Sequence, residues 1–150
     1  MDILFNTLHI VAAVFIVGPM AILPMTAMRS IRAGEAGQVA TLAKSVNLFT
    51  LLSIVVAFFG FGALGVSDPE DGFSFGSTWV LLSIVAYAIA LAINLFVVVP
   101  AMRQAAEAIT ATVGTTAPGA KPAGYSRVAM GSGISSLLLV IVVVLMVWKP

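Results

Sequence analysis

His9 is the only histidine of the chain, and it lies within a long apolar segment near the N-terminus. An ionisable side chain inside a membrane span is a candidate for function: an axial haem ligand, a copper ligand acting with methionine sulfur, or a proton acceptor. A metal or haem site needs more ligands, yet Met20, Met25 and Met28 lie toward the other end of the segment. A second copy of the chain could supply another His9. The pattern favours a neutral histidine that is bonded to a neighbouring helix or to interfacial water over these functional alternatives.

Other patterns that could do chemistry are weak. The chain has no cysteine, which excludes disulfides, thiolate zinc sites, thiol catalysis and iron–sulfur clusters. The acidic loop Asp68–Gly72 lacks the ligand spacing of a calcium loop and is expected to be a solvated turn. Proton-coupled carriers and four-helix drug exporters require a carboxylate inside a membrane span. None of the apolar segments of this chain contains one. These residues predict neither a metal site nor an enzyme, and no cofactor beyond the His9 alternative.

The composition identifies the class of protein that holds these residues. The chain has 150 residues, of which 61% are hydrophobic and 9% are charged, and its mean hydropathy is +1.14. Soluble domains carry about 25% charged residues, so a cytosolic enzyme and a disordered regulator are excluded. A net charge of +1 without a basic block also argues against a nucleic-acid partner. Membrane lipid is the expected surrounding.

Four segments free of charged residues are long enough to cross a bilayer as helices, which need about 20 residues. They are Ile3–Met28, Ser45–Val66, Ser77–Met102 and Val128–Trp148. Their apolar runs do not alternate in polarity as barrel strands do. The sequence therefore predicts an all-α, polytopic membrane protein, a four-transmembrane-helix bundle forming one transmembrane domain over residues 1–150.

The basic residues predict the orientation of this bundle. Six of the seven fall in the first and third connections, namely Arg29, Arg32, Lys44, Arg103, Lys121 and Arg127, whereas Lys149 lies on the other side. Because short cytoplasmic loops are enriched in Lys and Arg, we expect N-out/C-out topology in a bacterial inner (plasma) membrane. Trp79 and Trp148 then both lie at the outer interface, where indole rings anchor helices.

Three prolines interrupt the first and third predicted helices. Pro19, Pro24 and Pro100 each remove a backbone donor, so kinks that face protein are expected there. Pro24-Met-Thr-Ala-Met-Arg29 also resembles Pro100-Ala-Met-Arg103, through duplication of a hairpin or through chance. If the bundle has a docking face for another protein, the freed carbonyls place it on the first or third helix. The basic loop could add contacts there, although a solvated loop that sets the orientation is the favoured interpretation of its charges. The candidate residues of the docking face are Pro19, Pro24, Asn94, Pro100, Arg29 and Arg32.

Small and polar residues recur at helical spacing in the third and fourth predicted helices. They are Ser83, Ala86, Tyr87, Ala90 and Asn94 in the third helix, and the pairs Gly131/Ser135 and Ser132/Ser136 in the fourth. Small residues allow helices to approach closely, and hydroxyl or amide groups bond across them. These faces are expected to pack inside the bundle; a docking face or a lipid groove is the alternative.

Part of the first apolar segment is similar to a known group of membrane proteins. Leu8-His9-Ile10-Val11-Ala12, with Gly18 and Leu23-Pro24, resembles a group of uncharacterised bacterial four-helix integral membrane proteins. That group looks related to the copper-resistance D and HemJ-type protoporphyrinogen oxidase proteins, in which an early helix histidine binds haem or metal. The resemblance implies a four-helix fold, and only His9 corresponds to a ligand. The further membrane His and Lys residues of HemJ-type proteins are missing.

These observations lead to competing functional hypotheses. The first is a non-catalytic accessory subunit of a larger membrane complex, which would assemble, stabilise or regulate a transport or respiratory machine. The Ala/Gly/Val-rich composition is similar to that of small accessory subunits of actinobacterial assemblies, including MCE-type lipid importers. The second is a haem- or copper-binding membrane redox protein that uses His9. The third is a carrier of lipid or small solutes, dependent on His9 or Asn94.

Overall fold

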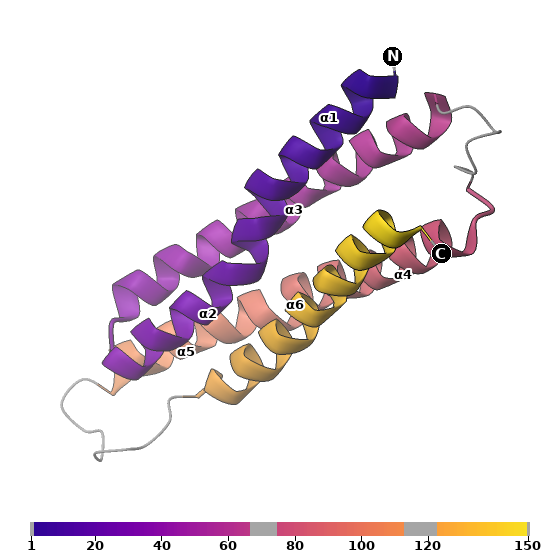
Figure 1. Ribbon diagram of the computed structural model, residues 1–150. Helices are drawn as coiled ribbons and strands as arrows, with labels where there is room; N and C mark the ends of the chain where they lie inside the picture. Colours follow the sequence, from indigo (N-terminus) through magenta and orange to yellow (C-terminus); the bar gives the residue numbers. More distant parts are fainter. Residues whose placement is uncertain (1, 67–74, 113–122, 150) are drawn as a thin grey trace.

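The computed structural model describes residues 2–66, 75–112 and 123–149, which form four long helical rods in antiparallel order (Figure 1). The acidic loop Asp68–Gly72 lies outside these residues. The first rod consists of α1 (Asp2–Ala12), η1 (Ala13–Val17) and α2 (Gly18–Ala33), and the second is α3 (Ala36–Val66). The third consists of α4 (Thr78–Ile93), η3 (Asn94–Val98) and α5 (Val99–Ala111), and the fourth is α6 (Tyr125–Trp148).

All four rods are long and apolar enough to cross a membrane. The predicted all-α fold with four spans is therefore confirmed for the described residues. The helices run past the predicted spans at one end: the first reaches Ala33, the second begins at Ala36 and the third reaches Ala111. We call this end, which carries Arg29, Arg32, Arg103 and Arg127, the basic end; both termini lie at the opposite end (Figure 1).

The densest packing lies toward the basic end. Small and branched side chains of α2, α3, α5 and the start of α6 form one buried cluster there, including Ala27, Ile31, Val39, Val46, Met102, Ala105 and Val128. A second cluster near the middle of the bundle joins Met20, Ala90 and Leu139, with Phe49 and Tyr87 packed against it. Alanine and valine make up most of the first cluster, and small side chains such as alanine allow the close backbone approach that stabilises helix pairs in lipid.

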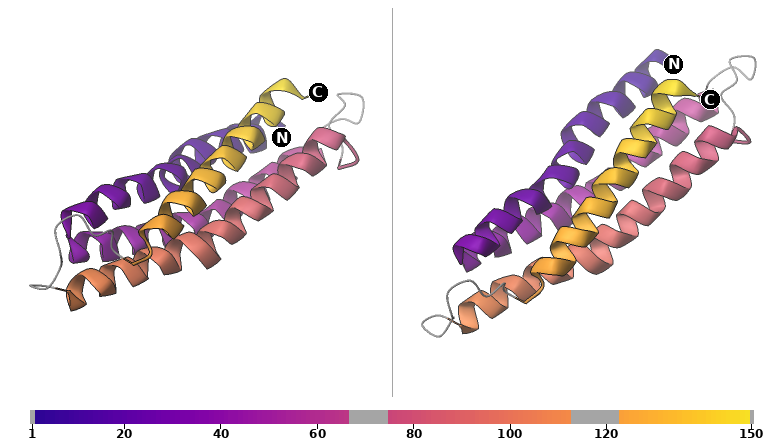
Figure 2. Two further views of the ribbon diagram at one scale, coloured as in Figure 1. Left: turned by 90° about the horizontal axis from the view of Figure 1, so that it is seen from below. Right: turned by 60° about the horizontal axis from the view of Figure 1, so that its bottom comes forward.

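The halves of the rods near the termini are arranged as two separate pairs. There α1 packs on α3, and α4 packs on α6 (Figure 2). The pairs are joined toward the basic end, where α2 contacts α6 and α5 contacts α3. None of the residues 3–17 is buried, and of α1 and η1 only Val17 packs against one of the two buried clusters.

The first and third rods share one irregularity, a π-helical turn followed by proline. In η1 the Gly18 N–H donates to the Ala13 carbonyl, and in η3 the Val99 N–H donates to the Asn94 carbonyl. Pro19 and Pro100 are the next residues in each rod. A proline has no N–H to donate to the preceding helical turn, and its ring crowds the backbone of that turn. A widened π-helical turn before the proline accommodates both the missing hydrogen bond and the ring. In the structure, Pro100 therefore corresponds to Pro19. The sequence similarity between Pro24–Arg29 and Pro100–Arg103 had matched Pro100 with Pro24, which lies in regular helix α2.

The small-residue faces pack inside the bundle. Ser83, Ala86, Ala90 and Asn94 are buried and Tyr87 is half-buried; on α6, Gly131, Ser132 and Ser135 are buried and Ser136 is half-buried. A Cβ on Gly131 would lie only 3.0 Å from Val98 Cγ2. Helices α4 and α6 therefore meet through these faces.

Candidate functional site

His9 is held by one hydrogen bond to the second rod. Its Nδ1 lies 2.8 Å from the main-chain carbonyl oxygen of Val56. Because a carbonyl only accepts hydrogen bonds, Nδ1 is the donor, which is the Nδ1–H tautomer whenever the ring is neutral. The other ring nitrogen, Nε2, then holds a lone pair that can accept a proton or bind a metal.

Gly60 makes room for this ring. A Cβ at Gly60 would lie 2.8 Å from Cε1 of His9, which is closer than real Cβ contacts come, and 3.1 Å from its Nδ1. The half-buried imidazole therefore packs against α3 at Gly60, one turn beyond its hydrogen-bond acceptor Val56. Val56 and Gly60 together position the ring on the second rod.

The structure places no other ligand type beside His9. Within the described ranges, no group of three or more His, Cys, Asp or Glu side chains could hold a metal ion. Met20 is buried in the central cluster, Met25 is exposed, and Met28 packs against the cluster at the basic end. Among the described residues, one chain therefore offers a haem or copper a single imidazole.

Polar side chains cross-link the rods near the middle of the bundle. The hydroxyls of Ser53 on α3 and Tyr87 on α4 lie 2.7 Å apart. The Ser136 hydroxyl on α6 donates to the Ala21 carbonyl of α2 at 3.2 Å. Each bond joins one hairpin to the other, so these groups serve the packing of the bundle.

Asn94 belongs to the same layer. Its Nδ2 donates to Ser135 Oγ at 2.8 Å, whereas its Oδ1 is buried and has no hydrogen-bond partner among the described residues. Asn94 is 1% exposed. Its amide therefore joins η3 to α6 and is not presented on the outer surface.

The remaining docking candidates divide by exposure. Pro24 is buried within regular helix α2, whereas Pro19 is half-buried and Pro100 is exposed. Arg29 is exposed at the basic end. Pro19 and Pro24 lie on the first rod and Pro100 lies on the third.

Arg32 has a partner of its own on the fourth rod. Its Nη2 donates to the Tyr125 hydroxyl, and its guanidinium carbon lies 5.2 Å from the centre of the Tyr125 ring. Tyr125 is buried in the cluster at the basic end. The pair ties α2 to the first residue of α6 through a hydrogen bond and a cation–π contact.

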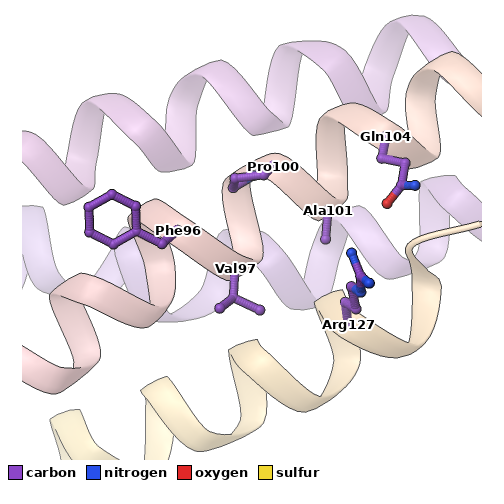
Figure 3. Close-up of a pocket in the computed structure, with 6 residues that line it drawn as sticks. All are labelled: Phe96, Val97, Pro100, Ala101, Gln104 and Arg127. Atoms are coloured by element: carbon purple, nitrogen blue, oxygen red, sulfur yellow. The ribbon is translucent and has the colours of Figure 1, made fainter.

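A groove between the third and fourth rods was not predicted from the sequence. It has a volume of about 220 Å³ and is lined by Phe96, Val97, Pro100, Ala101, Gln104 and Arg127 (Figure 3). The Arg127 side chain extends from α6 toward α5 and ends near Gln104, whereas Phe96 lies at the other end (Figure 3). The regular spacing of Phe96, Pro100 and Gln104 on one helix face was its only sequence signal.

Residues 3–150 match the model of a family described as "Predicted integral membrane protein (DUF2269)". The chain belongs to this family. A multi-pass membrane protein is thus supported both by the family and by the four spans. No curated protein and no solved structure gave a match.

Proposed function

We propose that this chain is a non-catalytic subunit of a larger inner-membrane complex, which it helps to assemble, stabilise or regulate. The observation that carries the proposal is the unburied stretch of residues 3–17, whose only extensive contact with another rod is with α3. Packing and interhelical hydrogen bonds drive helix association in lipid, so a helix with one neighbour gains little. A transmembrane helix of a partner protein would give α1 its second neighbour.

The polar groups of the described residues support this role. Ser53, Tyr87 and Ser136 bond within the bundle, and Asn94 bonds to α6. They hold two hairpins together and present no constellation for catalysis or ion transfer. The complex would be a transport or respiratory machine of a bacterial inner membrane, with the basic end in the cytoplasm. An actinobacterial MCE-type lipid importer is the specific candidate that the composition favours.

Photo-crosslinking at native expression level tests the proposal. A photoreactive residue replaces Phe15, which is 72% exposed on η1, and the control replaces Leu137, which is 62% exposed on α6. We expect one stoichiometric membrane-protein partner to be crosslinked from position 15 and not from position 137. Recovery of the chain alone after purification in mild detergent, or equal crosslinking from both positions, would overturn the proposal.

His9 supports a second candidate function, a haem- or copper-binding membrane redox protein of the kind found in the copper-resistance D and HemJ-type group. The specific observation is the hydrogen bond to Val56, which leaves Nε2 as the free ligand atom. Two copies of the chain would be needed for a pair of imidazole ligands. A Soret band or bound copper in fresh protein, lost in His9→Phe and kept in Met25→Leu, would support it. Absence of both signals would remove it.

A further inference from the structure

We propose that the groove between α5 and α6 binds the phosphodiester headgroup of an anionic phospholipid from the leaflet at the basic end. The site is independent of the proposed subunit role. Its polar end is formed by Arg127 and Gln104, and its apolar end by Phe96, Val97 and Pro100 (Figure 3). A phospholipid has the same order of groups, from a charged phosphate to apolar chains.

The depth of the groove fits this ligand. Phe96 and Gln104 are eight residues apart, which spans about 12 Å along a helix at about 1.5 Å per residue. The polar headgroup layer of a bilayer is only about 5–7 Å thick, so the groove extends from that layer into the hydrocarbon. Phe96 is 77% exposed, as expected for a side chain in contact with acyl chains.

The volume of the groove is large enough for only part of a phospholipid. Pockets that enclose a whole small molecule have volumes of about 300–1,000 Å³, and this groove has about 220 Å³. It therefore accommodates the phosphate and the start of the glycerol, while the chains lie outside along Phe96 and Val97. The absence of a side chain at Gly124 lets α6 begin this close to α5, since a Cβ there would lie 2.5 Å from the Ala101 carbonyl oxygen.

The charges favour an anion. No carboxylate lines the groove, and the described residues give the Arg127 guanidinium no hydrogen bond or ion pair. Guanidinium groups bind phosphate oxygens through two parallel hydrogen bonds, and the Gln104 amide can donate a third. Arg103 is exposed at the same end of the bundle but does not line the groove, and Glu107 lines a different hollow, between α3 and α5.

The test measures the unfolding midpoint of the purified protein in neutral-detergent micelles as phosphatidylglycerol is added, since a ligand of the folded state raises this midpoint. Arg127→Gln and Gln104→Leu are compared with Arg103→Gln, which removes the same charge from the same end of the bundle. We expect the apparent affinity for phosphatidylglycerol to fall about tenfold in Arg127→Gln and to change less than about twofold in Arg103→Gln. Equal unfolding midpoints without lipid show that the three variants fold alike.

Three results would overturn the proposal. Equal weakening by Arg103→Gln and Arg127→Gln would show general attraction to a basic surface. Equal binding of phosphatidylcholine would show that the groove does not select an anionic lipid. Stabilisation by inorganic phosphate that matches the effect of phosphatidylglycerol, with the same dependence on Arg127, would assign the site to a soluble anion.

Discussion

Asn94 donates from its side-chain Nδ2 to Ser135 Oγ over 2.8 Å, at the point where the third rod widens into a π-helical turn. The amide oxygen of the same side chain is buried without a partner among the described residues. A buried amide whose NH₂ group is bonded but whose oxygen is unpaired gains one hydrogen bond, while the oxygen loses its hydration without a replacement. Asn94 therefore fixes the register of η3 on α6 at a cost in stability.

The contribution of this bond is expected to be modest. Interhelical hydrogen bonds in membranes contribute about 0.6 kcal/mol on average and about 1.7 kcal/mol at most. We expect a double-mutant cycle of Asn94→Ala and Ser135→Ala to give a coupling energy in that range. Unfolding of the protein in mixed micelles is the measurement.

Ser136 provides the control for this cycle. It bonds to the Ala21 carbonyl and not to Asn94, so Asn94→Ala and Ser136→Ala should be additive to within about 0.5 kcal/mol. A coupling of Asn94 to Ser136 as large as its coupling to Ser135 would contradict the geometry.

Gly60 and His9 give a test of close packing at the first rod. The added methyl group of Gly60→Ala meets the imidazole, and overpacking of this kind costs about 1–3 kcal/mol. We expect His9→Ala to relieve most of that cost in the double variant, because the ring is then absent. The measurement is the free energy of unfolding of the four forms.

Gly65→Ala is the matched control, since a Cβ at Gly65 meets nothing within 4 Å. It should leave the stability unchanged or raise it slightly, because alanine favours helix over glycine. If His9→Ala left the cost of Gly60→Ala unchanged, the imidazole would not lie on Gly60.

Composition was enough to predict the four rods, because lipid requires every backbone group of a span to be bonded within a helix. The small-residue faces of α4 and α6 were likewise predictable from spacing alone. The hydrogen bond from His9 to Val56 was not, since the two residues are 47 positions apart and the acceptor is a main-chain carbonyl.

The prolines were only a partial guide to the irregular turns. Pro24 lies in a regular helix, whereas Pro19 and Pro100 each follow a π-helical turn. The difference depends on the turn before each proline and on its packing, which a proline in the sequence does not specify. The position of Arg127 in the groove was missed because a charge count treats each arginine only as a determinant of topology.

Arg32 and Tyr125 should stabilise the joint between the first and fourth rods. Tyr125→Phe keeps the ring and removes the hydroxyl that accepts from Arg32, so we expect a loss of about 1 kcal/mol. Arg32→Met also removes the cation–π contact and should cost about 0.5–1 kcal/mol more. Arg29→Met, at the same end, should change the unfolding free energy by less than about 0.5 kcal/mol. A loss for Arg29→Met as large as for Arg32→Met would show that general charge effects dominate.

The absence of native cysteine makes the orientation of the bundle directly measurable. Gly37 is exposed at the basic end, and a side chain there meets nothing within 4 Å, whereas Gly76 is exposed at the opposite end. Because basic loops are retained in the cytoplasm, a membrane-impermeant maleimide should label Gly76→Cys in intact cells and Gly37→Cys only after permeabilisation. The reverse pattern would place the termini inside. It would also move the Arg127 groove to the outer leaflet, so the labelling experiment decides which leaflet must supply the anionic lipid.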